Sequence, residues 1–92
     1  MGYSKMFNEK DERYIKELCE EYIEVCERYG KAVAKGNMKD ERLLYGDMCV
    51  KLGKLYGVIR YIGYLNEKLY VFNIVRGTVR ITDVETKEEV TY

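Results

Sequence analysis

Apolar residues follow a helical rhythm through the first third of the chain. They recur at spacings of three and four residues and form one stripe: Ile15, Leu18, Tyr22, Val25, Tyr29 and Ala32. The opposite side of the same turns is charged, which is typical of an amphipathic helix with one buried face. Asn8 is a favourable N-cap, and Gly36 stands where a left-handed C-cap is expected. The pattern therefore predicts a helix between these two residues.

A second helical pattern begins directly after Gly36, with Asn37 as its N-cap. Its apolar stripe repeats the same spacing through Tyr45, Met48, Leu52 and Leu55. Because only two residues connect the helices, we expect them to run antiparallel as a hairpin over about 8–56. Gly46 and Gly53 lie a heptad apart on one side of the second helix. Each costs up to about 1 kcal/mol relative to Ala, and either the close approach of another backbone or simple tolerance explains them.

Residues 56–65 allow two interpretations. The three-four spacing continues through Ile59 and Ile62, which would extend the second helix to the end of the segment. The segment is also dense in β-branched and aromatic residues and contains two glycines, and both features favour a strand over a helix. We therefore predict a strand here, followed by a turn at 66–68.

The rest of the chain alternates strand and turn patterns. Strands are expected at 69–75, 78–82 and 88–92, with turns at Arg76-Gly77 and at 83–87. Helices come first and strands afterwards, which indicates the α+β class. We predict an N-terminal antiparallel helical hairpin followed by a four-stranded antiparallel β-meander. With 92 residues, the chain is expected to be a single domain, 1–92, divided into a hairpin over about 8–56 and a meander over about 57–92.

Strand alternation divides the side chains of the predicted meander between two faces. The aliphatic set is expected to pack on the helical hairpin: Ile59, Leu65, Leu69, Val71, Val75, Val79 and Ile81. The other face is aromatic and basic, and it is our candidate binding face: Arg60, Tyr64, Tyr70, Phe72, Arg76 and Arg80, with Ile62 and Ile74 between them. Exposed patches of this kind are usually binding sites. If the sheet curled into a small barrel, Tyr70 and Phe72 would be interior instead, but these strands are short for a closed barrel.

The distribution of charge supports a distinct strand region. Sixteen basic and sixteen acidic side chains give a net charge of zero, which argues against a uniformly basic nucleic-acid binder and against an acidic DNA mimic. The net charge is −2 over residues 1–49, +5 over 50–82 and −3 over 83–92. A basic region therefore lies between two acidic ends, and the zero total does not exclude an anionic partner.

The residues that usually carry catalysis or bind metals are scarce. The chain has no His, and its three cysteines, Cys19, Cys26 and Cys49, form no CxxC pair. A zinc site is therefore not expected, and the cysteines are interpreted as small apolar residues without disulfides. No nucleotide-binding or hydrolase motif occurs. We predict a protein that is not an enzyme and holds no metal or cofactor.

The sequence favours a small protein-interaction module, either a homodimer or a binder of another protein, that uses the candidate binding face. Tyr and Arg are both enriched at the cores of protein interfaces. The alternative is a protein that binds single-stranded nucleic acid. In that case Tyr64, Tyr70 and Phe72 would stack on bases, while Arg60, Arg76 and Arg80 would neutralise phosphates. A salt titration of oligonucleotide binding distinguishes the two.

Composition also suggests where the protein comes from. Lys and Glu are abundant and Gln is absent, a bias described for hyperthermophile proteins. An origin in a hyperthermophilic archaeon or one of its viruses is expected. The first residues lack the apolar segment of a signal peptide, and no apolar run is long enough to span a bilayer. The expected location is the cytoplasm, without membrane association.

Overall fold

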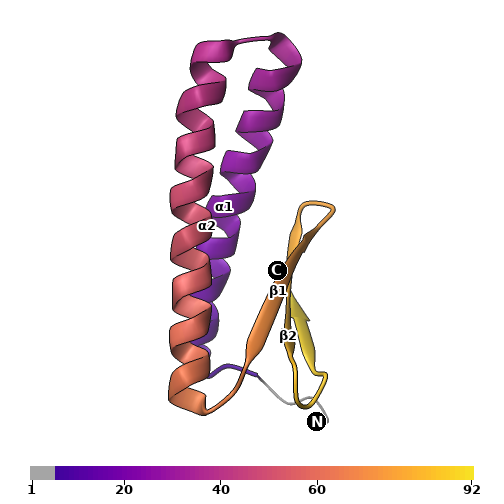
Figure 1. Cartoon of the computed structure of the whole chain (residues 1–92). Coiled ribbons are helices and arrows are strands. Elements are labelled where there is room, and N and C mark those ends of the chain that lie inside the picture. Colours follow the sequence, from indigo (N-terminus) through magenta and orange to yellow (C-terminus); the bar gives the residue numbers. More distant parts are fainter. Residues whose placement is uncertain (1–5) are drawn as a thin grey trace.

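A computed structural model describes residues 6–92 of the chain (Figure 1). Two long helices, α1 (Glu9–Lys35) and α2 (Met38–Asn66), are followed by three strands, β1 (Tyr70–Val75), β2 (Thr78–Asp83) and β3 (Glu89–Thr91). The strands form one antiparallel sheet in the order β1-β2-β3. The α+β class and the helical hairpin are confirmed, but the sheet has three strands and not four.

The predicted capping residues stabilise the ends of the two helices. The Asn8 side chain accepts a hydrogen bond from the Asp11 N–H at 2.8 Å, and Asn37 accepts one from the Asp40 N–H at 3.2 Å. Gly36 adopts the left-handed conformation (φ 70°), and its N–H and that of Asn37 donate to carbonyls of the last turn of α1. Asn37 therefore belongs to the C-terminal cap of α1 and is also the N-cap of α2, which makes the connection between the helices short.

The strand predicted over 56–65 is wrong, because these residues form the last third of α2. Leu55, Ile59 and Ile62 continue the helical stripe and are 0%, 1% and 5% exposed. Strand propensities span only about 1 kcal/mol per residue, whereas burying each of these side chains contributes about 1.5–3 kcal/mol. The extended-helix alternative is therefore correct, the hairpin runs to Asn66 and not to residue 56, and the sheet begins at Tyr70.

The prediction of which β1 side chains face the helices is also wrong. Ile74 lies opposite Val79, and Phe72 lies opposite Ile81. Directly opposed residues share a face, so Tyr70, Phe72 and Ile74 point toward the helices together with the buried Val79 and Ile81, whose inward packing is confirmed. The residues predicted to pack there are exposed instead: Leu69, Val71 and Val75, as well as Leu65 on α2. The two-residue turn at Arg76-Gly77 sets this register, because it makes Val75 and Thr78 a pair.

The core lies where the sheet covers the hairpin, between the first half of α1 and the last third of α2. Its buried residues come from the N-terminal segment, both helices and the sheet: Phe7, Ile15, Leu18, Cys19, Leu55, Ile59, Ile62, Tyr70, Val79 and Ile81. The sheet packs with β1 against α2 and β2 against α1. It covers only part of the hairpin, whose connected end projects beyond it and gives the molecule extents of 47 × 24 × 21 Å (Figure 1).

Gly63 permits the tight reversal between α2 and β1. A Cβ atom at this position would lie 2.7 Å from the carbonyl oxygen of Lys68 and 3.4 Å from the Tyr70 ring. That carbonyl cannot move away freely, because the Lys68 N–H donates to the Gly63 carbonyl at 2.8 Å and closes the helix end.

Gly63→Ala is therefore expected to lower the free energy of unfolding by about 1–3 kcal/mol through overpacking, partly offset by the helix propensity of Ala. Gly30→Ala in α1 is the matched control, because nothing lies within 4 Å of its Cβ position. This control should raise stability by up to about 1 kcal/mol. Urea denaturation of both variants measures the difference, and two changes of the same sign would contradict the prediction.

Candidate interaction surface

The two helices differ in how much of their circumference is apolar. In α1 about half of the residues are charged, and they occupy one solvated face. In α2 only about a quarter are charged, and apolar residues and glycines extend around most of the helix. A helix that is apolar on several faces is normally covered on several faces. In this chain α1 and the sheet cover one side of α2, and the other side is exposed.

The exposed side of α2 contains a row of glycines flanked by large side chains. We call it the open face of α2, and at 100° per residue it lies opposite α1: Gly46, Val50, Gly53, Gly57, Tyr61 and Tyr64. Val50, Tyr61 and Tyr64 are 66%, 63% and 82% exposed. Nothing lies within 4 Å of the Cβ positions of the three glycines. No backbone within residues 6–92 therefore explains these glycines by close approach.

Within residues 6–92, β1 has a free edge, which lies beside α2. Backbone bonding alternates along an antiparallel pair, and the Val84 N–H donates to the Leu69 carbonyl at 3.0 Å. Residues 71, 73 and 75 therefore bond to β2, while the N–H and C=O groups of Phe72 and Ile74 point away from it. The opposite edge, β3, has only three residues, begins with Glu89 and is preceded by Glu88. β1 has six residues and no charge, so it lacks the usual protection of an exposed edge.

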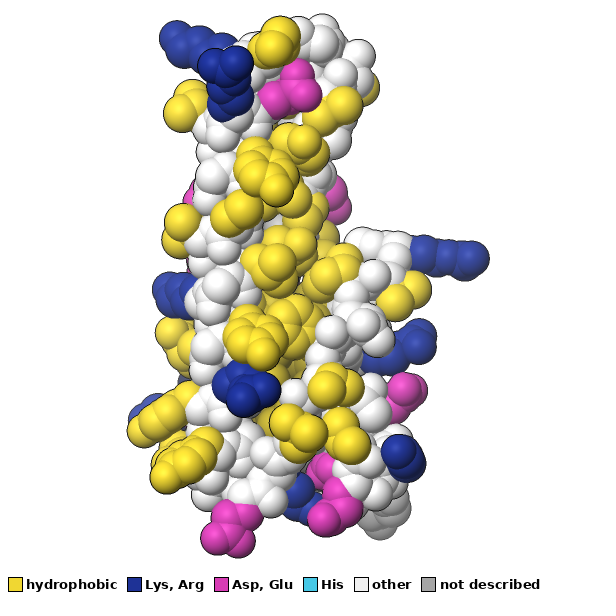
Figure 2. Space-filling view, in the orientation of Figure 1, with side chains coloured by type: hydrophobic (Ala, Val, Ile, Leu, Met, Phe, Trp, Pro, Cys, Tyr) yellow, Lys and Arg dark blue, Asp and Glu magenta, His cyan; other side chains and the backbone are white. Residues whose placement is uncertain are grey.

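An apolar groove joins the free edge of β1 to α2. It is lined by Tyr56, Ile59, Arg60, Tyr70, Val71 and Phe72 and has a volume of about 240 Å³. The rings of Tyr56 and Phe72 lie 6.1 Å apart, and the Arg60 guanidinium lies 5.7 Å from the centre of the Tyr56 ring. Figure 2, which shows this side of the molecule, has a nearly continuous band of hydrophobic side chains along the hairpin and across to the sheet. The side of α2 that carries Tyr56 and Arg60 and the edge of β1 thus form one surface.

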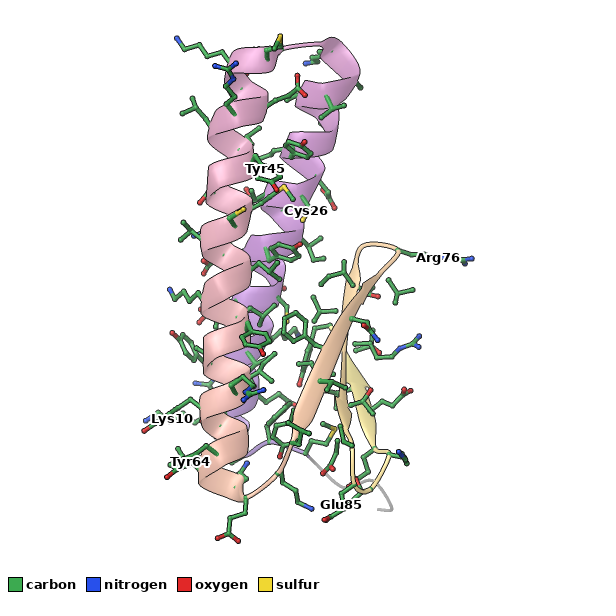
Figure 3. The ribbon with its side chains drawn as sticks, viewed as in Figure 1. Lys10, Cys26, Tyr45, Tyr64, Arg76 and Glu85 are labelled. Carbon is green, nitrogen blue, oxygen red and sulfur yellow. The ribbon has the colours of Figure 1, made fainter. Side chains whose placement is uncertain are left out.

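The six residues of the candidate binding face do not form a single sheet face. Arg60 and Tyr64 belong to α2, and Tyr64 points away from the rest of the molecule (Figure 3). Tyr70 and Phe72 face the helices, and Tyr70 is only 5% exposed. Arg76 lies in the hairpin turn and extends outward from it (Figure 3), and Arg80 is exposed on the outer side of β2. The structure therefore brings only Arg60, Tyr70 and Phe72 together, in the groove.

The strand predicted for residues 56–65 conceals the open face of α2. The heptad spacing of Gly46 and Gly53 was one available signal. A helix continued to residue 66 adds Gly57, Tyr61 and Tyr64 to the same side. The helical interpretation alone would thus have revealed the face.

The ionisable groups with altered pKa values have structural roles. Burial and, to a smaller extent, nearby Glu20 raise the pKa of the Cys19 thiol to about 12, so this thiol stays protonated. Burial also tends to raise the pKa of the Asp83 carboxyl, but N–H donors from Thr86 and Glu85 and the nearby Lys68 outweigh it and lower the pKa. Those N–H groups lie 3.2 and 2.9 Å from Asp83 Oδ1. Asp83 therefore organises the turn before β3.

Residues 6–92 offer no grouping of side chains suited to a metal ion, and the three cysteines are free. Within the same residues, neither helix is both long and apolar enough to cross a membrane. No family model, curated protein or solved structure matches the chain. The exposed apolar surface of α2 and β1 is the candidate functional feature of residues 6–92.

Proposed function

We propose that this chain is a protein-interaction module that binds a second copy of itself or another protein through the open face of α2 and the free edge of β1. The observation that carries the proposal is the uncovered apolar side of α2, where three large side chains are 63–82% exposed. Exposed apolar groups release water when a partner covers them, which contributes about 25 cal/mol per Å². Tyr and Arg, both present here, are enriched at interface cores.

The total surface area supports an interface. The chain exposes 6692 Å², whereas a folded monomer of this mass exposes about 5,600 Å². The excess is about 1,100 Å², which is comparable to the roughly 800 Å² that each partner buries in an interface of standard size. Its radius of gyration of 14.9 Å also exceeds the roughly 12 Å of a compact domain of this length. Both quantities reflect the elongated hairpin, which leaves apolar surface that a partner could cover.

Single-stranded nucleic acid has less support as a partner. Stacking needs exposed ring faces near cationic side chains, but Tyr70 is buried, and Arg76 and Arg80 lie away from the groove. Our proposal includes neither catalysis nor a cofactor. It retains the expected cytoplasmic location, and it retains a hyperthermophilic archaeal or viral origin, which is supported by composition alone.

The proposal is tested by placing a charge on the open face. Val50→Glu should abolish concentration-dependent association in sedimentation velocity, or abolish capture of a protein that the unmodified chain captures. Val33→Glu is the matched control, because Val33 is an exposed valine of α1 (46% exposed) away from this surface. The unmodified chain and the control should behave alike. Two results together would overturn the proposal. The unmodified chain would stay monomeric at millimolar concentration, and every protein that it captures would also be captured by Val50→Glu.

A further inference from the structure

We infer that the partner is a second copy of this chain, which pairs its β1 antiparallel with the first β1 about a twofold axis through Asn73. This inference rests on the proposed function and specifies its partner and geometry. It joins the two three-stranded sheets into one of six strands and removes the unprotected edge of each. The edges that remain exposed are then the two short β3 strands.

The register follows from the backbone groups of β1. Phe72 and Ile74 present their N–H and C=O groups to the free edge, so they must form the hydrogen-bonded pairs between the two strands. When Phe72 lies opposite Ile74 of the second copy, Asn73 lies opposite itself and Val71 lies opposite Val75. Val71 and Val75, which are 45% and 36% exposed, then form apolar cross-strand pairs on the outer face. In the alternative register Phe72 lies opposite Phe72 of the second copy. Val71 then lies opposite Asn73, an apolar side chain against a polar one, so this register is less complementary.

The same axis brings the two α2 helices together. α2 packs over β1 and α1 over β2, so α2 is the helix nearer the free edge. A second copy related by the axis therefore places its α2 antiparallel beside the first. Gly53 and Gly57 each come three residues before a groove residue, Tyr56 and Arg60, so they lie beside the groove on the surface of α2. The Tyr56–Phe72 ring contact shows that Gly57 lies near the level of the axis. Helices that pack at 8–10 Å need small residues where they come closest, which gives Gly53 and Gly57 a role that nothing within residues 6–92 provides.

The surface fits a second copy better than an unrelated partner. The strand that would pair has no charge, so its antiparallel repetition brings no like charges together. In an isologous contact each copy uses the same patch. This patch complements itself, because the apolar side chains of β1 face one another and the glycines of α2 face the large side chains of the other α2.

Cross-linking tests the axis directly. Asn73→Cys is made with Cys26→Ser and Cys49→Ser, while the buried Cys19 is kept. In the inferred register the two Cα atoms at position 73 lie about 4.5 Å apart, which is within the range of a disulfide. Arg80→Cys in the same background is the matched control, because Arg80 lies opposite Asn73 on the same exposed face. Its two copies would be three strand spacings apart, about 14 Å, which is too far for a bridge.

Mild oxidation followed by non-reducing electrophoresis should convert most of Asn73→Cys to a covalent dimer and leave Arg80→Cys monomeric. As an independent measurement, Gly57→Ala should raise the dimer dissociation constant about tenfold, the equivalent of 1.4 kcal/mol, and Gly30→Ala should leave it unchanged. A dimer that cross-links equally at both positions and tolerates Gly57→Ala would overturn this geometry but not the proposed function. A chain that binds only a different protein would overturn the inference, and a chain that binds nothing would overturn both.

Discussion

Replacing Tyr70 with Ala is expected to lower the free energy of unfolding by about 3–5 kcal/mol, the cost of deleting a buried aromatic side chain. Tyr70 is 5% exposed, and its ring meets the Phe7 ring edge to face at a centroid distance of 5.0 Å. Its hydroxyl donates to the Met6 carbonyl and accepts from the Asn66 side chain, both at 3.4 Å. Tyr70 therefore links the start of the chain, the end of α2 and β1, and its loss removes all three contacts.

Tyr64→Ala is the matched control for Tyr70→Ala. The sequence assigned both tyrosines to one binding face, but Tyr64 is 82% exposed. Its replacement should change the stability of the monomer by less than about 0.5 kcal/mol. Urea denaturation at a concentration where the chain is monomeric measures both variants. Equal and small losses would show that Tyr70 is a surface residue and would contradict the fold described above.

Raising the pH above 9 is expected to destabilise the protein, with Cys19 as the first cause. Its pKa rises from 9.0 to about 12 on folding because the thiol is buried. The stabilisation from the neutral thiol is therefore complete below pH 9 and is lost as the pH rises toward 12, at about 1.4 kcal/mol per pH unit. Tyr22 acts in the same direction between pH 10 and about 12, since burial and the neighbouring Cys26 raise the pKa of its phenol.

Guanidinium denaturation at pH 8 and pH 10 separates these groups. Wild-type protein should lose about 1–2 kcal/mol over this interval, mostly from Cys19. Cys19→Ala should be less stable at pH 8 but should lose much less on going to pH 10. Cys49→Ala, which removes an exposed cysteine of α2, should keep the wild-type pH dependence. If Cys19→Ala kept that dependence as well, the thiol would not be the titrating group.

The proposed dimer gives a function to an otherwise costly feature of α2. Gly46, Gly53 and Gly57 each weaken the helix by up to about 1 kcal/mol relative to Ala, and no contact within residues 6–92 requires them. Gly63 is different, because its missing side chain makes room for the Lys68 carbonyl. One glycine of α2 thus serves the fold of the monomer, and the other three lie where an interface would use them.

Local chemistry in the sequence determined most of the elements. Asn8 and Asn37 mark the helix starts and Gly36 the first helix end, because each satisfies backbone groups that a helix leaves unpaired. The Arg76-Gly77 turn also determined the strand register, since a two-residue turn allows only one pairing of its flanks. Applied to β1, that rule alone would have turned Tyr70 and Phe72 toward the helices.

Only the tertiary structure decided between helix and strand for residues 56–65. The local preferences of β-branched and aromatic residues favour a strand by small amounts, and the helical spacing of Ile59 and Ile62 competes with them. What separates the two states is the burial of Leu55, Ile59 and Ile62 against α1 and the sheet, a larger energy that exists only once those elements are in place. The same packing leaves the other side of α2 uncovered, so the glycine spacing indicates where the open face lies, but only the assembled fold decides that it stays exposed.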